Sequence, residues 1–308
     1  SAVYQLKYMD SVPDSAVCNE AVKLAVKKGF GTLRGFVNGV LRNVARGLDQ
    51  VEYPTEGIER LSVVYSMPEW ILKLWKKTYD LDVIESMLQA FQEETPVTIR
   101  CNLAKTTPEN LKESLQKEGV TVTPHPYLSY AFWIQDYDHL SELESFQKGE
   151  FYVQDISSML VGELADPKKG DRVIDVCAAP GGKALHVAEK LRGTGSVEAR
   201  DLSLYKVGLI TENIERSGLT NIHAVQKDAT VCDADVKDAA DLVIADLPCS
   251  GLGVLAKKTD LKYKATEQST KELAGLQREI LKNAASYVRP GGTLIYSTCT
   301  INPAENIE

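Results

Sequence analysis

The sequence predicts an α/β fold in which residues 151–308 form a doubly wound parallel sheet, preceded by a small α+β subdomain and a short all-α segment. From Gly170 onward, short apolar runs alternate regularly with helical patterns, as they do when helices cover both faces of a parallel sheet. The expected strands are residues 172–176, 196–199, 223–226, 242–246 and 293–297. The longest helix, Glu267 to Val288, is expected to end at a proline and glycine stop before the last strand.

The first 50 residues are expected to be helical. Apolar residues recur at helical spacing from Val17 to Lys28 and from Leu33 to Arg46, and Gly29 and Gly31 between the two runs are stop signals. A linker is expected at about residues 50–59.

Residues 51–150 are predicted to hold this linker and the α+β subdomain. Helical patterns cover residues 68–79, 83–92 and 108–118, and short strand-like runs cover 97–101 and 132–135. Five aromatic residues of this segment could serve a nucleic-acid ligand: Trp70, Trp75, Tyr127, Tyr130 and Trp133. Packing in the core is the commoner use of such side chains, and stacking on unpaired bases is the alternative.

A glycine-rich turn follows the first strand of the predicted sheet, in Cys177-Ala178-Ala179-Pro180-Gly181-Gly182-Lys183. It matches neither the P-loop nor the Gly-x-Gly-x-x-Gly pattern, and its proline lacks an N–H that a phosphate would use. The same strand, turn and helix, with an acidic residue closing the next strand, is how class I methyltransferases hold S-adenosylmethionine. Asp201 has that place, where a carboxylate can accept both ribose hydroxyls. Taken without the other motifs, the glycine-rich segment could also be a tight turn that binds no ligand.

Two cysteines follow later strands of the same sheet, in Asp246-Leu247-Pro248-Cys249-Ser250-Gly251 and in Ser297-Thr298-Cys299-Thr300. Ligands of open α/β sheets bind at the carboxyl ends of the strands, so the glycine turn and both cysteines should converge on one crevice. Methylating cytosine at C5 needs a thiolate that adds to C6 and a second group that assists release. A lone cysteine is more often a small buried apolar residue, but two at strand ends favour this chemistry.

In order and spacing, these motifs resemble those of the Sun (Fmu) family of RNA cytosine-5 methyltransferases. The resemblance rests on residues 177–183, 246–255 and 296–306, with a similar lead-in at 152–159. Residues 19–22 and 35–42 are similar to the end of a NusB-like RNA-binding domain, which points to the bacterial small-subunit rRNA enzymes of that family. The resemblance implies a class I, Rossmann-like methyltransferase domain at 151–308 and a NusB-like remnant at 1–50. A tRNA substrate, or a non-catalytic assembly factor that binds RNA on the same fold, remains an alternative.

The resemblance also implies roles for individual residues. Cys299 would attack C6 and Cys249 would assist release, the reverse of the arrangement in DNA cytosine-5 methyltransferases. Asp246 would hydrogen-bond the flipped base, and Lys183 would lie near the cytosine or that carboxylate. The cofactor would contact Cys177, Ala178, Ala179, Pro180, Gly181, Gly182, Lys183, Asp201, Lys206, Asp228 and Asp246. Asp201 and Asp228 have an alternative role, because aspartates at strand ends often cap turns.

The net charge of −8 weighs against a nucleic-acid partner, because Lys and Arg that neutralise phosphates provide much of the affinity. The basic residues are nevertheless clustered. Residues 21–48 contain no acidic residue and carry Lys23, Lys27, Lys28, Arg34, Arg42 and Arg46. A second cluster, where relatives carry two arginines, comprises Lys257, Lys258, Lys262 and Lys264. We interpret the two clusters as an RNA path, with an ordinary solvated surface as the alternative.

The composition suits a monomeric cytoplasmic protein of two or three domains. No run of 18 apolar residues and no signal segment is present, so we expect no membrane partner. Six cysteines without Cys-x-x-Cys spacing suit a reducing compartment and argue against a metal site. The NusB-like match begins partway through a domain, and nine residues after Cys299 are too few for the usual final hairpin of a class I sheet. We therefore expect a part of a longer protein.

Overall fold

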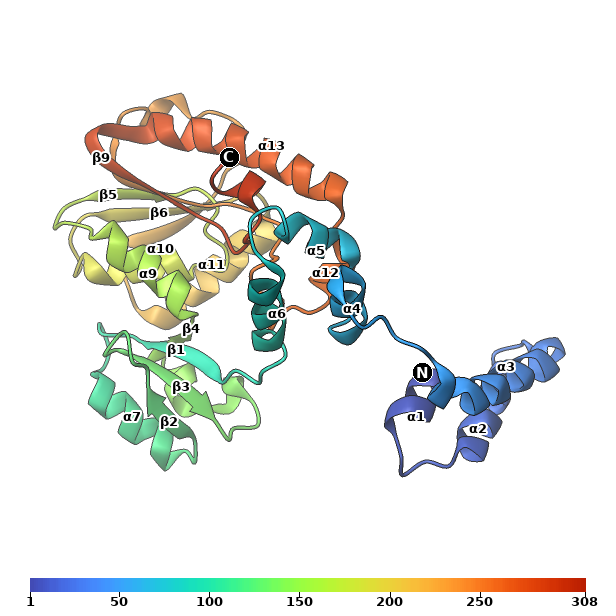
Figure 1. The fold of residues 1–308 in the computed structure, drawn as a ribbon. Helices are drawn as coiled ribbons and strands as arrows, with labels where there is room; N and C mark the ends of the chain where they lie inside the picture. Colours follow the sequence, from blue (N-terminus) through green and yellow to red (C-terminus); the bar gives the residue numbers. More distant parts are fainter. The chain divides into compact units, whose positions relative to one another are not determined.

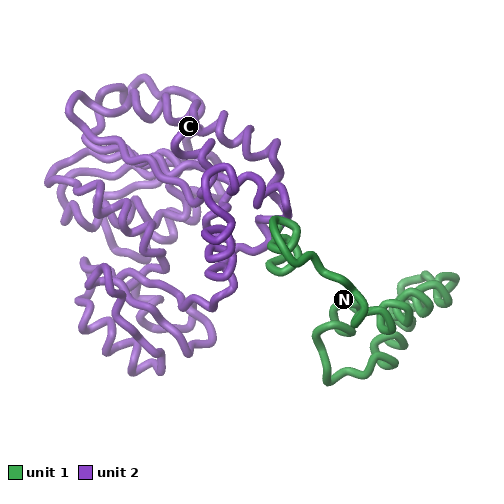
Figure 2. The backbone as a smooth tube through the Cα atoms, viewed as in Figure 1, with its two compact units in different colours: residues 1–67 green, residues 68–308 purple.

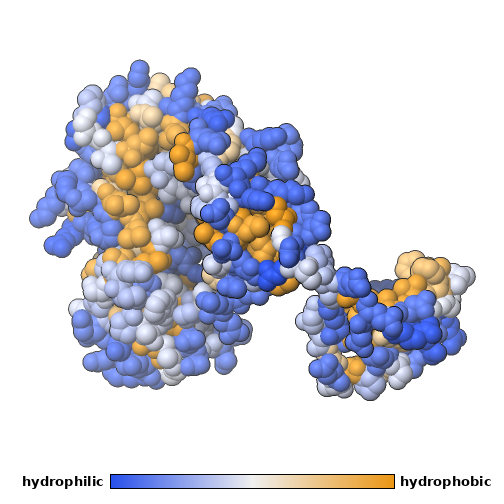
Figure 3. Space-filling model, in the orientation of Figure 1, coloured by the Kyte–Doolittle hydropathy of each residue, from blue (hydrophilic) through white to orange (hydrophobic).

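The computed structural model describes all 308 residues, which divide into two compact units, residues 1–67 and 68–308 (Figure 2). The first unit contains α1 (Ala2–Tyr8), α2 (Asp14–Lys27), α3 (Arg34–Gly47) and α4 (Gly57–Val64). Its helices α2 and α3 are the two that the apolar spacing predicts. The residues expected to form a linker include the first turn of α4. The core of this unit is small, and hydrophobic side chains such as Phe36 on α3, which is 69% exposed, lie at its surface; Figure 3 shows hydrophobic surface on this unit.

The second unit begins with α5 (Glu69–Trp75) and α6 (Leu81–Ala90) and contains two sheets (Figure 1). The smaller sheet is antiparallel, in the order β2-β3-β1-β4. Its strands are β1 (Val97–Cys101), β2 (Thr121–Pro124), β3 (Ala131–Gln135) and β4 (Phe151–Val153), so the fourth strand lies beyond residue 150. The sequence predicted β1 and β3, whereas β2 and β4 had no separate signal.

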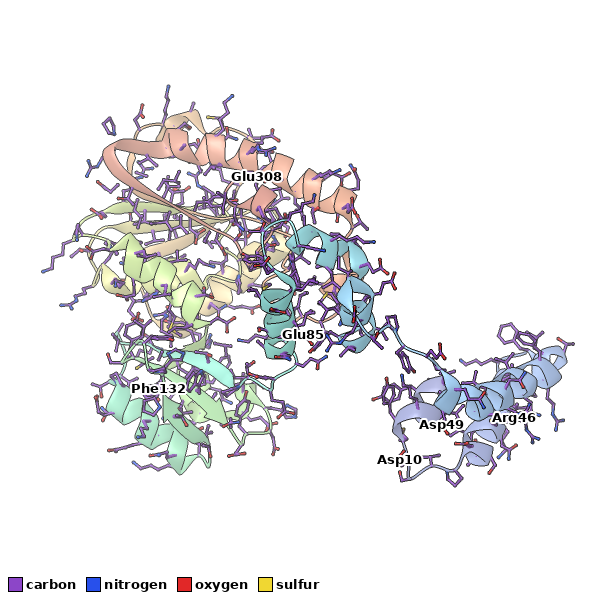
Figure 4. The ribbon with its side chains drawn as sticks, in the orientation of Figure 1. Asp10, Arg46, Asp49, Glu85, Phe132 and Glu308 are labelled. Carbon is purple, nitrogen blue, oxygen red and sulfur yellow. The ribbon has the colours of Figure 1, made fainter.

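The two faces of the small sheet differ because successive side chains of a strand point to opposite sides. Ile99 and Phe132 belong to the apolar core that the sheet forms with α7 (Pro108–Lys117); Figure 4 labels Phe132 on its strand. Thr98, Arg100 and Trp133 lie on the other face, Thr98 directly opposite Trp133 in the β1–β3 pairing. The Thr107 hydroxyl caps α7 by accepting a hydrogen bond from the Asn110 N–H at 3.2 Å. Short helix α8 (Glu144–Gln147) precedes β4.

The larger sheet is parallel, in the order β7-β6-β5-β8-β9. Its strands are β5 (Arg172–Asp175), β6 (Ser196–Asp201), β7 (Ile222–Gln226), β8 (Ala240–Asp246) and β9 (Val288–Ser297). One face is covered by α9 (Ile156–Ala165), α10 (Gly182–Lys190) and α11 (Leu204–Ser217), and the other by α13 (Glu267–Tyr287) (Figure 1). The predicted doubly wound fold is therefore confirmed. The strand order reverses between β5 and β8, where open α/β sheets bind their ligands.

A buried polar network joins the two sheets. Arg100 on β1 forms an ion pair with Glu189 on α10, with Nη1 and Oε2 3.0 Å apart, and its Nε donates to Gln154 Oε1 at 2.7 Å. The guanidinium lies 4.3 Å from the ring centre of Tyr152. Removing one partner of such a buried pair typically costs about 3–5 kcal/mol. The network therefore fixes the small sheet against α10, the helix that begins at the glycine turn. None of the helices is long and apolar enough to span a membrane.

Candidate active site

The glycine-rich turn leaves β5 and leads directly into α10. Gly181 has φ of +111°, a conformation that side-chain-bearing residues rarely adopt. The Ala178 N–H donates to the Arg200 carbonyl at 2.8 Å, and the Gly181 N–H donates to the Ala178 carbonyl at 2.6 Å. The Ala179–Pro180 peptide bond is cis. The backbone of the turn is thereby held against the carboxyl end of β6.

Asp201, at the end of β6, connects the turn to its neighbours. Its Oδ2 accepts from the Ala179 N–H at 3.0 Å, and its Oδ1 accepts from the Leu202 N–H at 2.8 Å. Lys206 on α11 forms an ion pair with the same carboxylate, Nζ to Oδ1 3.1 Å. The structure thus brings together three of the predicted cofactor residues, Ala179, Asp201 and Lys206. The Asp201 side chain also supports the turn, as its alternative role requires.

Asp228, predicted to lie near the adenine, is an exposed residue just beyond β7. Its Oδ1 accepts hydrogen bonds from the N–H and the hydroxyl of Thr230, at 2.9 and 2.7 Å. These bonds hold the pKa of the Asp228 carboxyl below its usual range. Asp228 therefore caps a turn in this structure.

Asp175 is a residue of the site to which the sequence analysis gave no role. It ends β5 and is fully buried. Its Oδ1 accepts from the Cys177 N–H at 3.3 Å, whereas Oδ2 has no hydrogen-bond partner. Burial, and then the nearby Asp246 carboxylate, raise the pKa of Asp175 to about 7. Buried polar atoms are nearly always paired, so the bare oxygen marks a place for a cationic or hydrogen-donating ligand group. The only sequence signal was an acidic residue directly before the turn.

Cys249 and Cys299 lie in contact. Their Sγ atoms are 3.0 Å apart, and the Cys299 N–H donates to Cys249 Sγ at 3.2 Å. The two thiols meet because β8 and β9 are adjacent parallel strands whose ends are in register, with Asp246 opposite Ser297. Each cysteine is therefore carried on the loop that leaves one of two adjacent strand ends, as the sequence analysis expected.

The two thiols differ in acidity. A hydrogen bond from the Cys249 thiol, together with the charges of Lys258 and Lys183, lowers the pKa of Cys299 to about 7, against the opposing effects of burial and of Asp246. The same hydrogen bond and burial raise the pKa of Cys249. Cys299 is therefore the group that becomes a thiolate near neutral pH. Burial raises the pKa of Cys177 to about 12, which leaves that third thiol of the site inert.

Asp246 and Lys183 form the polar side of the site. Lys183 Nζ lies 2.5 Å from Asp246 Oδ2, and the Ser297 hydroxyl donates to Asp246 Oδ1 at 2.7 Å. Lys183 comes from the first turn of α10 and Asp246 ends β8. The glycine turn, this ion pair and the two cysteines thus lie at the carboxyl ends of β5, β8 and β9.

Comparisons with known proteins agree with this geometry. The family model described as 16S rRNA methyltransferase RsmB/F matches residues 163–308, the NusB family model matches 1–46, and an RsmF/B-like ferredoxin-like domain matches 67–137. A probable ribosomal RNA small subunit methyltransferase B from Bacillus subtilis is 37% identical over 309 residues, which cover 100% of this chain and 69% of the relative. The chain belongs to the RsmB/F family. It is therefore an S-adenosylmethionine-dependent RNA methyltransferase.

Two further proteins are similar to this chain in sequence or in structure. Ribosomal RNA small subunit methyltransferase B of Vibrio cholerae is 31% identical over 312 residues, covering 99% of this chain and 69% of the relative. The crystal structure of NSun6 from Pyrococcus horikoshii with SFG superposes with a TM-score of 0.70 at 26% identity, over 76% of this chain and 84% of that one.

Glu305 connects the two cysteine loops of this RsmB/F enzyme, and the sequence analysis gave it no role. Its buried carboxylate accepts from the Ser250 N–H at 2.8 Å and from the Ser250 hydroxyl at 2.6 Å. It also accepts from Gln277 Nε2 at 3.1 Å and from Asn302 Nδ2 at 2.9 Å. Ser250 follows Cys249 and Asn302 lies three residues after Cys299, so Glu305 positions both loops. In the sequence, Glu305 is visible only as part of the motif at residues 296–306.

The four lysines after the Pro-Cys motif do not form one exposed patch. Lys257 pairs with Asp155, and Lys258 is exposed and close enough to Cys299 to affect its pKa. Lys264 pairs with Asp260 at 2.5 Å, whereas Lys262 is buried. The expectation that all four form an RNA path is therefore corrected for Lys262, which is a buried residue and not part of an exposed basic surface.

Proposed function

We propose that this enzyme transfers a methyl group to C5 of a cytosine in small-subunit ribosomal RNA through a covalent bond between Cys299 and C6. The observation that carries the proposal is the pair of touching thiols with opposite pKa shifts. Covalent catalysis at C6 needs one thiolate and a second group beside it, and this pair meets both needs. The relatives that share the whole chain are named for small-subunit rRNA, which supports that substrate.

The residues around the glycine turn fit the cofactor. S-adenosylmethionine supplies the methyl group when bound. The unpaired Oδ2 of Asp175 suits its ammonium group, and the Asp201 carboxylate beside Lys206 suits its ribose hydroxyls. The backbone of residues 177–182 would line the same site, and the Cys177 side chain has no chemical part in it. Asp228 would approach the adenine at the end of β7.

Asp246, Lys183 and the cysteines account for the steps on the base. Asp246 accepts a hydrogen bond from the exocyclic N4 amino group of the flipped cytosine, and the ion pair with Lys183 orients that carboxylate. The Cys299 thiolate then adds to C6, which makes C5 nucleophilic. After C5 is methylated, its proton passes to a base or to solvent, the electrons of the C5–H bond restore the C5–C6 double bond, and Cys299 leaves C6 as a thiolate. Cys249, 3.0 Å from the attacking sulfur, assists this elimination.

Separate replacement of the two cysteines tests the proposal. The substrate is 16S rRNA from cells that lack this gene, with a radioactive methyl group on the cofactor and bisulfite sequencing to locate the product. Cys299→Ala should transfer no methyl group and form no adduct. Cys249→Ala should transfer the methyl group but stay bound to the RNA as a species that survives denaturing electrophoresis. Cys232→Ala, at an exposed thiol outside the site, is the matched control and should behave as the parent.

Three results would contradict the proposal. An adduct that accumulates with Cys299→Ala and disappears with Cys249→Ala would reverse the two roles. Methyl transfer to tRNA but not to 16S rRNA would show that the substrate is tRNA. A parent that binds RNA and transfers no methyl group to it would favour the assembly-factor alternative.

A further inference from the structure

A cavity of about 420 Å³ lies between the small sheet and the loop that follows Cys249. Its walls come from three places: Thr98 and Trp133 on the sheet with His125 beside them, Asp155 at the start of α9, and Gly253 and Lys257 in the loop. Sites for small organic groups usually have volumes of about 300–1,000 Å³. This cavity is therefore large enough for a nucleobase with its sugar.

The aromatic wall of the cavity is formed by the face of the small sheet that α7 leaves uncovered, because successive side chains of a strand point to opposite faces. The face that carries Ile99 and Phe132 is filled by α7, whereas Thr98 and Trp133 point the other way and line the cavity. Trp133 is held edge-on by the His125 ring, with ring centres 4.6 Å apart. Among the five aromatic residues singled out in the sequence, Trp75 is fully buried and Tyr130 is hydrogen-bonded to Glu163 at 2.5 Å. Trp133 is the one of the five that lines this cavity.

His125 adds a hydrogen-bonding group to the same wall. Its Nδ1 accepts from the Tyr127 N–H at 3.3 Å, and burial lowers the pKa of the ring, which is therefore neutral. The proton of a neutral ring whose Nδ1 is an acceptor lies on Nε2. Nε2 makes no hydrogen bond within the chain, so it is a donor for the acceptor edge of a base.

The opposite wall is tied to the proposed nucleophile. The Gly253 N–H donates to the Cys299 carbonyl at 3.0 Å, and a Cβ on Gly253 would lie only 2.9 Å from that oxygen. Gly253 therefore lines the cavity and also contacts the backbone of Cys299. At its mouth, Lys257 pairs with Asp155, and the side chains of both are about two-fifths exposed. A phosphate could compete with the Asp155 carboxylate for this lysine.

We propose that the cavity takes the unstacked base of a nucleotide that neighbours the target cytosine, with the base on Trp133, its edge at His125 Nε2 and its phosphate at Lys257. The inference rests on the proposed function, since it places this base beside the cytosine that reacts with Cys299. If Trp133 stacks on this base, the small sheet helps to select the RNA substrate, in addition to packing against the methyltransferase domain. Single-stranded RNA is commonly recognised by such stacking of splayed bases on aromatic side chains.

An abasic scan of the RNA tests the inference through affinity. The probe is the shortest fragment of 16S rRNA that the parent retains in a binding assay, with one base removed at a time. At one position, removal should weaken binding to the parent by roughly tenfold, as loss of a stacked base does. Trp133→Ala should bind the intact fragment equally weakly, and removal of the same base should then cost less than about twofold. Trp133→Phe should restore most of the parent's sensitivity.

The controls separate this inference from misfolding and from the proposed function. Tyr127→Ala removes an exposed aromatic ring that contacts His125 but does not line the cavity, and it should keep the full abasic effect. Unchanged S-adenosylmethionine affinity would show that Trp133→Ala is folded. An equal abasic effect in the parent and in Trp133→Ala at every position would overturn the inference. Because affinity is measured, this result is independent of methyl transfer, whose absence would instead contradict the proposed function.

Discussion

Cys249 and Cys299 are the same residue type, and only their surroundings give them different protonation states. Their sulfur atoms are 3.0 Å apart, and the hydrogen bond between them raises the pKa of Cys249 and lowers that of Cys299. The charges of Lys258 and Lys183 also favour the Cys299 thiolate, whereas that of Asp246 opposes it. Cys299 is therefore the cysteine with more thiolate at neutral pH.

The rate of methyl transfer should consequently depend on pH through Cys299. The reactive form is the deprotonated one, and the pKa of Cys299 is about 7, so kcat/KM should fall as the pH drops below that value and level off above it. Lys258→Ala removes a charge that favours the thiolate and should move the profile to higher pH. Lys264→Ala, whose lysine pairs with Asp260, is the control and should leave the profile in place. Initial rates measured from below to above pH 7 test this pH dependence. A value of kcat/KM that does not change through pH 7 would contradict the role of the Cys299 thiolate.

At the residue scale, the sequence predicted the groups that carry chemistry better than the groups that hold them. The turn and the two cysteines follow strands, so their convergence could be inferred from the rule for parallel sheets. The roles of Asp175 and Glu305 arise from burial and from bonds to residues far along the chain. Spacing carries no information on such contacts. Lys262 was misjudged for the same reason, because burial depends on tertiary packing.

Among the elements, those with strong apolar periodicity were predicted closely. β1 has the expected bounds, and α13 differs by one residue at its end. β2 was missed because one of its four residues, Val122, is buried and the other three are exposed polar residues or proline. β4 has three residues, too few to show a period. β2 is held in the sheet by β3, the next strand along the chain, and β4 by β1, about 50 residues earlier.

The short segment after β9 depends on Glu305 for its position. Glu305→Ala would remove an acceptor from buried donors of Ser250, Gln277 and Asn302, at a cost of about 1–3 kcal/mol for each donor that finds no other partner. We expect the free energy of unfolding to fall by roughly 2–4 kcal/mol and methyl transfer to fall with it, because both cysteine loops lose their connection. Urea denaturation and initial rates measure the two effects.

The glycine turn does not contact Glu305, so cofactor affinity should change little in this variant. Glu272→Ala removes an exposed carboxylate on α13 and is the matched control. A Glu305→Ala protein with parental stability and parental rate would show that the cysteine loops hold their positions without it.

On the scale of the whole molecule, affinity for RNA must arise locally, because the net charge of −8 repels phosphate. In the first unit, Lys23 forms an exposed ion pair with Glu20 at 2.6 Å, which partly offsets the charge of one member of the basic cluster at residues 21–48. Near the site, Lys257 and Lys258 are the exposed cations on the loop after Cys249. The third exposed lysine of this cluster, Lys264, lies on α12 (Leu261–Lys264) and pairs with Asp260, so we expect Lys257 and Lys258 to contribute most.

Lys257→Ala and Lys258→Ala should each weaken RNA binding and flatten its dependence on salt. Each phosphate contact on a single strand contributes about 0.7 to the slope of log K against log salt, so the double variant should lose roughly 1.4. Asp155→Asn should strengthen binding, because it frees Lys257 from its acidic partner. Lys264→Ala serves as the control for simple loss of charge. Affinities measured over a series of salt concentrations give the slopes, and equal slopes for the parent and the double variant would mean that these lysines are an ordinary solvated surface.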